Sequence, residues 1–193
     1  MRGLRVAWQC EEMGLPYEAR AFDYPPPANY RPKYPPGSVP FLEDDGGVAM
    51  GESVAMMIYL ARRYGPTPLL PDDPAAMARV LQLTVAAEAA MGGLMNPLMG
   101  TFFSAPEDQK ANWTNGFCEA QVRQALGYAQ DLLGDREFFV GDGLTLADIA
   151  VSTSLGMWAG ALGKEIPPGL AAHRERMMAR AAYQRAKSAF SAA

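Results

Sequence analysis

The sequence predicts a mixed α+β N-terminal domain followed by an all-α, helical C-terminal domain. Two observations support this division. Before residue 66, helical periodicity is mixed with strand and hairpin patterns, whereas after residue 73 only helical patterns and helix-capping signals occur. The segment PTPLLPDD at 66–73 contains three prolines, which cannot continue a helix. We therefore predict an N-terminal domain over residues 1–65, a linker over 66–73 and a helical domain over 74–193.

The first predicted element is a helix over residues 4–14. Val6, Cys10 and Met13 lie at helical spacing and would share one apolar face. Residues 17–22 (YEARAF) then alternate between apolar and polar side chains, which predicts a half-buried strand.

A β-hairpin and a helix complete the predicted N-terminal domain. Residues 39–43 and 48–50 flank the sequence DDGG at 44–47, whose aspartates and glycines favour a tight turn. A helix is predicted over 52–64. The strand at 17–22 and the hairpin lack a strand between them, so we expect an incomplete sheet whose central strand is missing.

The C-terminal domain shows the signals of several helices. Asp73 followed by Pro74 is typical of an N-cap and a first helical position, which predicts a helix that continues into the region of Met91. A second helix is predicted over 107–133, and a final amphipathic stretch over 174–190.

The most apolar run of the chain, residues 144–162, is predicted to be a buried helix. Thr145 and Asp148 have the spacing of a capping box, so we assign Asp148 a structural role. A carboxylate is costly in lipid, so we do not predict that this run spans a membrane. The first residues lack the pattern of a signal peptide, and we predict a cytoplasmic location.

Charge and metal-ligand content exclude further classes. The chain has 17 Lys and Arg against 21 Asp and Glu, a net charge of −4, so no nucleic-acid partner is predicted. His173 is the single histidine, which excludes a multi-histidine metal site, and no metal is predicted. Cys10 and Cys118 do not have CxxC spacing and are expected to be reduced, buried thiols; for Cys10 the alternative is a nucleophile.

Two short motifs have the chemistry of a peptide-binding site. Val39-Pro40 is either an edge-strand proline or a cis proline that turns the amide and carbonyl of Val39 toward an extended peptide. Glu52-Ser53 is either a plain helix start or an anion site, in which the free amides and the Ser53 hydroxyl bind a carboxylate while Glu52 binds an ammonium group. One carboxylate and one ammonium group on an extended peptide describe the γ-glutamyl end of glutathione.

These motifs stand in stretches that resemble the cytosolic glutathione transferase superfamily. The stretches are RVAWQCEEMGLPYE at 5–18, PPGSVPFLEDD at 35–45, GESVAMMIYLARRYG at 51–65, FFVGDGLTLADIA at 138–150 and RERMMARAAYQRA at 174–186. The resemblance covers nearly the whole chain. It implies a thioredoxin-like N-terminal domain, an all-α C-terminal domain and a homodimer.

The resemblance also implies glutathione as co-substrate and assigns its binding residues. These would be Val39 and Pro40 for the cysteinyl backbone, Glu52 and Ser53 for the γ-glutamyl group, and Lys33 or Ser38 for the glycyl carboxylate. By alignment, the family's first strand and thiol-activating residue would fall at or just before Met1. The catalytic residue is therefore unidentified in this sequence, which resembles a shortened member of the family, and we expect low transferase turnover.

The function implied is transfer of the glutathione thiol to an apolar electrophile. Alternatives on the same fold are a non-catalytic glutathione-binding or scaffold protein, and a glutathione-dependent isomerase, dehalogenase or reductase. A methionine stripe predicts either core or dimer interface, or an adaptable pocket for the electrophile. The residues of this possible pocket are Met91, Met95, Met99 and Phe102.

Overall fold

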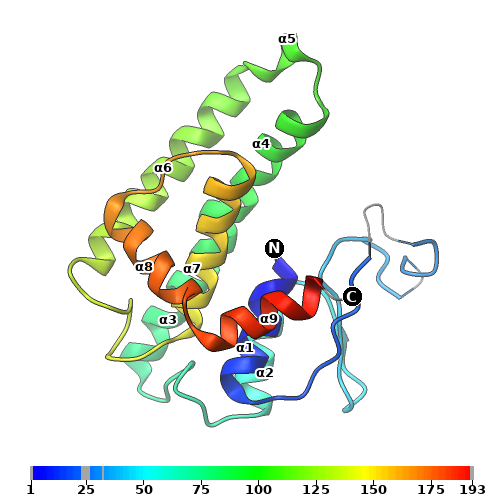
Figure 1. Ribbon diagram of the computed structural model, residues 1–193, viewed down its shortest axis with the longest axis vertical. Helices are drawn as coiled ribbons and strands as arrows, with labels where there is room; N and C mark the ends of the chain where they lie inside the picture. The colour runs from blue at the N-terminus through cyan, green and yellow to red at the C-terminus, as the bar shows by residue number, and fades with distance from the viewer. Residues whose placement is uncertain (1, 23–26, 32, 192–193) are drawn as a thin grey trace.

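The computed structural model describes residues 2–22, 27–31 and 33–191. A small N-terminal part of two helices and a hairpin packs beside a larger bundle of helices (Figure 1). The elements are α1 (Arg2–Met13), β1 (Leu42–Glu43), β2 (Ala49–Met50), α2 (Ser53–Arg63), α3 (Pro74–Ala86), the π-helical segment η1 (Ala87–Gly92), α4 (Gly93–Ser104), α5 (Glu107–Lys110), α6 (Trp113–Leu133), α7 (Leu146–Gly156), the π-helical segment η2 (Met157–Ala161), α8 (Pro168–Met178) and α9 (Ala181–Ser191).

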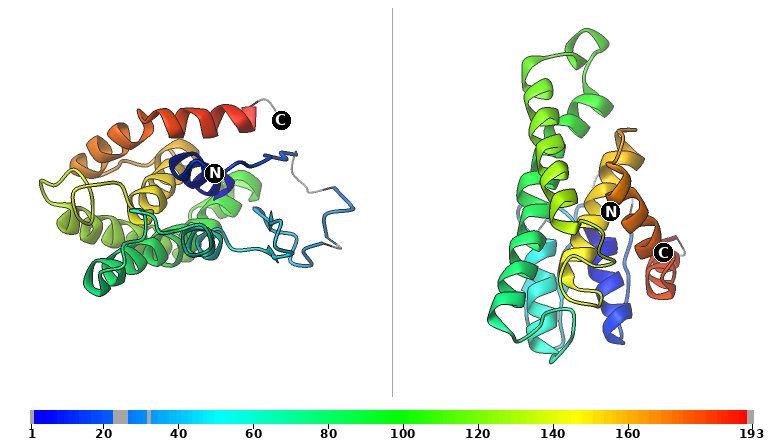
Figure 2. Two further views of the ribbon diagram at one scale, coloured as in Figure 1. Left: turned by 90° about the horizontal axis from the view of Figure 1, so that it is seen from below. Right: turned by 90° about the vertical axis from the view of Figure 1, so that its left-hand side faces the viewer.

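The predicted first helix is confirmed as α1, which lies at the centre of the N-terminal part. It packs between α9 and α2 and also contacts α7 (Figure 2). Its apolar face is buried, including Val6, Trp8 and Cys10. Gly14 follows with a φ of 65°, a conformation that favours glycine and ends the helix.

The predicted hairpin is confirmed, but the predicted strand at 17–22 is wrong. Leu42 pairs with Met50 and Glu43 with Ala49, and this antiparallel pair is the whole sheet that the described residues form. Residues 17–20 do alternate between half-buried and exposed side chains, yet they join no ladder. A strand requires a partner for its backbone groups, and residues 17–22 have none in the described part of the chain.

A carboxylate fixes the hairpin to α2. Asp44, at the start of the turn, accepts hydrogen bonds from the hydroxyls of Tyr59 at 2.6 Å and Tyr64 at 2.5 Å. Gly47 supplies the positive φ of 75° that the turn requires. The hairpin is therefore held against the middle and the C-terminal end of α2.

Two predicted helices are each divided in the structure. The helix expected over 107–133 is interrupted after α5, because Asn112 caps α6 by accepting from the amide of Asn115 at 2.9 Å. The stretch expected over 174–190 is interrupted at residues 179–180, between α8 and α9. This break redirects α9 so that it lies along α1.

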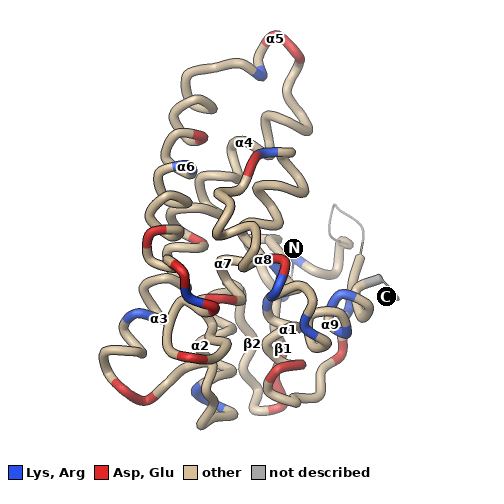
Figure 3. Tube along the Cα trace, turned by 60° about the vertical axis from the view of Figure 1, so that its left-hand side comes forward, with Lys and Arg blue, Asp and Glu red and all other residues tan. Residues whose placement is uncertain are grey.

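Ion pairs join α9 and the residue just before it to α1. Arg180 Nε lies 2.7 Å from Glu12 Oε1, and Arg185 Nε lies 2.6 Å from Glu11 Oε2. Figure 3 shows the basic residues of α9 beside α1. The end of the chain is thereby fixed to the first helix.

The centre of the helical part is α7, as predicted, and all of its residues are buried. Its capping box is present: Asp148 Oδ2 accepts from the amide of Thr145 at 2.8 Å. The amide of Leu146 donates to the carbonyl of Leu69 at 2.9 Å, which ties the segment between α2 and α3 to this helix. No helix among the described residues is long and apolar enough to cross a membrane.

Candidate functional site

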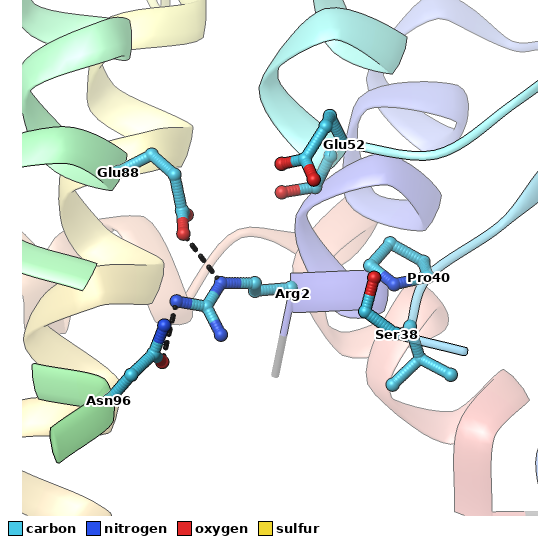
Figure 4. A pocket seen from close by; sticks show the side chains of 8 residues that line it. Arg2, Ser38, Pro40, Glu52, Glu88 and Asn96 are labelled. Atoms are coloured by element: carbon cyan, nitrogen blue, oxygen red, sulfur yellow. Dashed lines mark hydrogen bonds and ion pairs between the residues drawn. The ribbon is translucent and has the colours of Figure 1, made fainter. Parts of the chain in front are cut away.

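A cavity of about 130 Å³ lies where the N-terminal part meets the helical part (Figure 4). The four residues of the two short motifs, Val39, Pro40, Glu52 and Ser53, line it together with Ser38, which the family resemblance named as one of two candidates. Three further lining residues were not predicted: Arg2, Glu88 and Asn96. The cavity therefore combines segments that are far apart in the sequence, from α1, the residues before β1, α2, η1 and α4.

The first turn of α2 forms one wall. Ser53 is its first residue and is 2% exposed, and its helix presents amide groups that have no partner within the helix. Glu52, just before it, has φ 64° and ψ 98°, and it is the single non-glycine residue with positive φ in the described chain. Such strain costs about 1–3 kcal/mol and is typical of binding sites.

A second wall is the backbone before β1. The Val39–Pro40 peptide bond is cis, as one of the two interpretations of this motif required. Val39 is 48% exposed, and neither its N–H nor its C=O is bonded to another described residue. The hydroxyl of Tyr30 donates to the carbonyl of Ser38 at 2.7 Å and anchors the segment. Val39 thus offers a free donor and a free acceptor to an extended ligand.

Below Ser53 lies a completely buried arginine, Arg5. It donates to Glu88 Oε2 at 2.8 Å, to Thr153 Oγ1 at 3.0 Å, to Ser154 Oγ at 3.2 Å and to Ser53 Oγ at 3.4 Å. Burial lowers the pKa of Arg5, and the charge of Glu88 opposes this shift. Because Ser53 Oγ accepts from Arg5, its own hydrogen is available for an anion in the cavity.

The third wall is Arg2 with its partners. Arg2 Nε donates to Glu88 Oε1 at 2.7 Å, and Nη2 donates to the carbonyl of Gly92 at 3.1 Å and to Asn96 Oδ1 at 3.0 Å. The sequence did contain a signal for this wall: Arg2 and Arg5 are three residues apart and share one face of α1. Their common partner, Glu88, is more than eighty residues away in the sequence and could not be inferred.

Lys33 and the predicted electrophile pocket lie outside this cavity. Lys33 Nζ lies 3.0 Å from Glu43 Oε1 and does not line it. Met91 and Met95 are buried in the core, which agrees with the core interpretation of the methionine stripe. Met99 is partly buried and Phe102 is 51% exposed, so these two remain available to a ligand.

The remaining candidates have structural environments. Cys10 is buried, and desolvation raises the pKa of its thiol to about 11, as expected for an unreactive thiol. Met1, the position expected for the activating residue, lies outside the described residues. The described residues contain no cluster of histidine, cysteine or carboxylate side chains that could hold a metal ion.

Comparison with known proteins matches two family domains. The glutathione S-transferase N-terminal domain matches residues 3–68, and the glutathione S-transferase C-terminal domain matches residues 94–181. Glutathione S-transferase GstB of Escherichia coli is 31% identical over 155 residues, which cover 77% of this chain and 74% of that protein. Glutathione S-transferase 3 of Schizosaccharomyces pombe is 29% identical over 167 residues, which cover 76% of this chain and 66% of that protein, slightly less than two thirds.

Solved structures show the same fold. A glutathione transferase homolog from Lodderomyces elongisporus, solved with two GSH per subunit, superposes with a TM-score of 0.84 at 22% identity, covering 97% of this chain and 93% of the other. The theta class glutathione S-transferase of Xanthomonas axonopodis pv. citri, solved with glutathione bound, gives 0.78 at 27% identity, covering 96% and 91%. The thioredoxin-like N-terminal part with a short sheet and the helical C-terminal part are thereby confirmed.

Proposed function

Because this chain belongs to the glutathione transferase superfamily, we propose that its cavity binds glutathione and that the bound thiol attacks an apolar electrophile. The observation that carries the proposal is the meeting of the free Val39 backbone and the first turn of α2 in one cavity. Relatives solved with glutathione bound support the same ligand.

The γ-glutamyl group would occupy the start of α2. Its carboxylate would accept from the Ser53 hydroxyl and the free amides of the first turn, where the helix dipole favours negative charge. Its ammonium group would pair with Glu52, whose side chain makes no capping hydrogen bond to the helix. The strained backbone at Glu52 aims its carboxylate and the Ser53 hydroxyl at the same ligand group.

The cysteinyl residue would pair its backbone with the N–H and C=O of Val39, beside Pro40. This contact recognises an extended peptide through its backbone groups, and it leaves the cysteine side chain free to react. The glycyl carboxylate would then lie toward Ser38, which lines the cavity. Lys33 would reach the glycyl carboxylate only if its ion pair with Glu43 were broken.

The reaction needs the glutathione sulfur as a thiolate. Its S–H proton passes to solvent, the sulfur lone pair forms a bond to the electrophilic carbon, and the leaving group departs with the electrons of its own bond. Met99 and Phe102 would supply apolar contacts to the electrophile. We include a homodimer in the proposal, as the family resemblance implies.

Isothermal calorimetry with glutathione tests the binding site. Ser53→Ala removes one hydroxyl bond to a charged group, worth about 1.5–3 kcal/mol, so affinity should fall about tenfold or more. Ser188→Ala, an exposed hydroxyl on α9, is the matched control and should bind like the wild type. An unchanged affinity in Ser53→Ala would refute the assignment.

A turnover assay separates the enzyme from a binding protein. The same preparation is incubated with glutathione and an aryl halide, and release of halide is followed. Release that saturates with glutathione supports the transferase. Tight binding without any release, across several electrophile classes, would instead support the non-catalytic binding protein.

A further inference from the structure

We propose that the guanidinium group of Arg2 is the cation that stabilises the thiolate of bound glutathione, and that Asn96 and Glu88 position it. The inference rests on the proposed function, because it assumes that glutathione occupies the cavity. It gives a thiolate-stabilising role to a described residue of α1.

The geometry of Arg2 leaves one edge of the guanidinium free. Nε is bonded to Glu88 and Nη2 to Gly92 and Asn96, whereas Nη1 has no partner among the described residues. Figure 4 shows this third nitrogen pointing away from Glu88 and Asn96, with Ser38 and Pro40 across the cavity. Three hydrogen bonds on the other two nitrogens fix the orientation of the planar group.

The local charge count also favours an anion. Glu88 is shared by two arginines, at 2.7 Å from Arg2 and 2.8 Å from Arg5, so this cluster of three side chains carries a net charge of +1. Glu52, the other acidic residue lining the cavity, is assigned to the ammonium group of the ligand. The positive charge that remains is on the Arg2 side, and Arg5 is completely buried beneath it.

The binding mode directs the cysteine side chain toward this wall. When the cysteinyl backbone pairs with Val39, its side chain projects out of the pairing plane. Arg2 lies on the wall opposite the Ser38–Pro40 segment (Figure 4). In this proposal the sulfur lies on the side of the cavity that holds the guanidinium of Arg2, within reach of its free Nη1.

The chemistry requires no proton transfer to Arg2. The S–H bond breaks, the proton goes to solvent, and the electron pair remains on sulfur as a negative charge. Arginine stays protonated throughout, so it acts only by electrostatic attraction and hydrogen bonding. A cation within about 4–6 Å of an acid lowers the pKa of that acid by about 1–3, here from the ordinary cysteine value of about 8.5.

The test is a spectroscopic pH titration of glutathione bound to the full chain, following the ultraviolet absorbance of the thiolate. Arg2→Gln should raise the pKa of the bound thiol by about 1–3 relative to the wild type. Arg2→Lys keeps the charge and should restore part of the difference. Arg20→Gln removes an exposed arginine outside the cavity and should leave the titration unchanged.

A second variant tests the positioning of Arg2. Asn96→Ala removes one of the three bonds from an exposed residue, so the fold should be retained and the pKa of the bound thiol should rise by less than in Arg2→Gln. Binding of S-methylglutathione, which has no ionisable thiol, should be equal in all variants. This readout separates loss of thiolate stabilisation from loss of binding.

Three results would overturn the proposal. A wild-type chain that does not bind glutathione refutes the proposed function and this inference with it. A wild type that binds glutathione with the ordinary thiol pKa refutes this inference alone. An Arg2→Gln variant that loses S-methylglutathione affinity while the thiol pKa stays unchanged would show that Arg2 binds a carboxylate.

Discussion

Replacing Asp148 with alanine removes an acceptor of four hydrogen bonds at the buried start of α7. Oδ1 accepts from the amide of Phe139 and lies 3.0 Å from His173 Nε2, and Oδ2 accepts from both the amide and the hydroxyl of Thr145 at 2.8 Å. The carboxylate is completely buried. Asp148→Ala therefore leaves several donors without a partner, a larger perturbation than the loss of a surface helix cap.

The expected cost follows from this geometry. Each buried donor left without an acceptor costs about 1–3 kcal/mol, so losing the acceptor of several donors should cost about 3–5 kcal/mol in total, against about 0.5–2 kcal/mol for a cap alone. For a chain of this length, each kcal/mol lowers Tm by about 2–4 °C. We therefore expect Tm to fall by about 6–20 °C, with glutathione affinity per folded molecule unchanged, because Asp148 does not line the cavity.

Differential scanning calorimetry measures the change in Tm, and glutathione titration below the transition measures affinity. Asp131→Ala, an exposed carboxylate on α6, is the matched control and should change neither quantity. A Tm for Asp148→Ala equal to that of the control would refute the assigned structural role. A collapse in affinity at unchanged Tm would show that Asp148 acts in binding.

Two further predictions concern α1. Burial raises the pKa of Glu12, but hydrogen bonds from Arg180 and Trp8 outweigh it and hold the pKa below its ordinary value, so Glu12 stabilises the fold at neutral pH. This stabilisation is lost as the pH falls below about 4.3, the ordinary pKa of glutamate. The difference in Tm between the wild type and Glu12→Gln should therefore shrink below that pH. A difference in Tm that grows with acidity would contradict this prediction. With its pKa near 11, the Cys10 thiol should stay unmodified by a thiol-selective reagent at pH 8 in the folded chain, and rapid labelling would contradict its burial.

Local signals in the sequence predicted the helices with strong caps and the site motifs next to them. Asp73-Pro74 and the Thr145–Asp148 box are short-range patterns whose hydrogen bonds form within one turn. Glu52-Ser53 is predicted as a helix start for the same reason, because the signal for a helix start lies within a few consecutive residues. The break at Asn112 was missed because periodicity continues across it, although asparagine is a common N-cap.

Tertiary partners could not be predicted in the same way. The side chains of residues 17–20 do alternate between half-buried and exposed positions. A β-strand also needs a neighbouring strand that pairs with its backbone, and the sequence pattern does not show whether such a neighbour exists. The resemblance names Lys33 as a candidate for binding the glycyl carboxylate, but in the structure its ammonium group is bonded to Glu43 of β1. The Arg2–Glu88–Arg5 cluster joins residues 83 and 86 positions apart, and its members are ordinary helix-surface residues when taken alone.

The buried central helix also sets the position of the cavity, which links the stability of the fold to the site. Ser154 donates to the carbonyl of Ala87 at 2.8 Å, and the same hydroxyl and Thr153 accept from Arg5. The residue after Ala87 is Glu88, so this end of α7 holds both the π-helical segment and the buried arginine that orient the cavity charges. Asp148 fixes the opposite end of α7, more than one turn away. The site should therefore tolerate loosening of that end as long as Thr153 and Ser154 remain buried, which is why affinity and stability are expected to separate in Asp148→Ala.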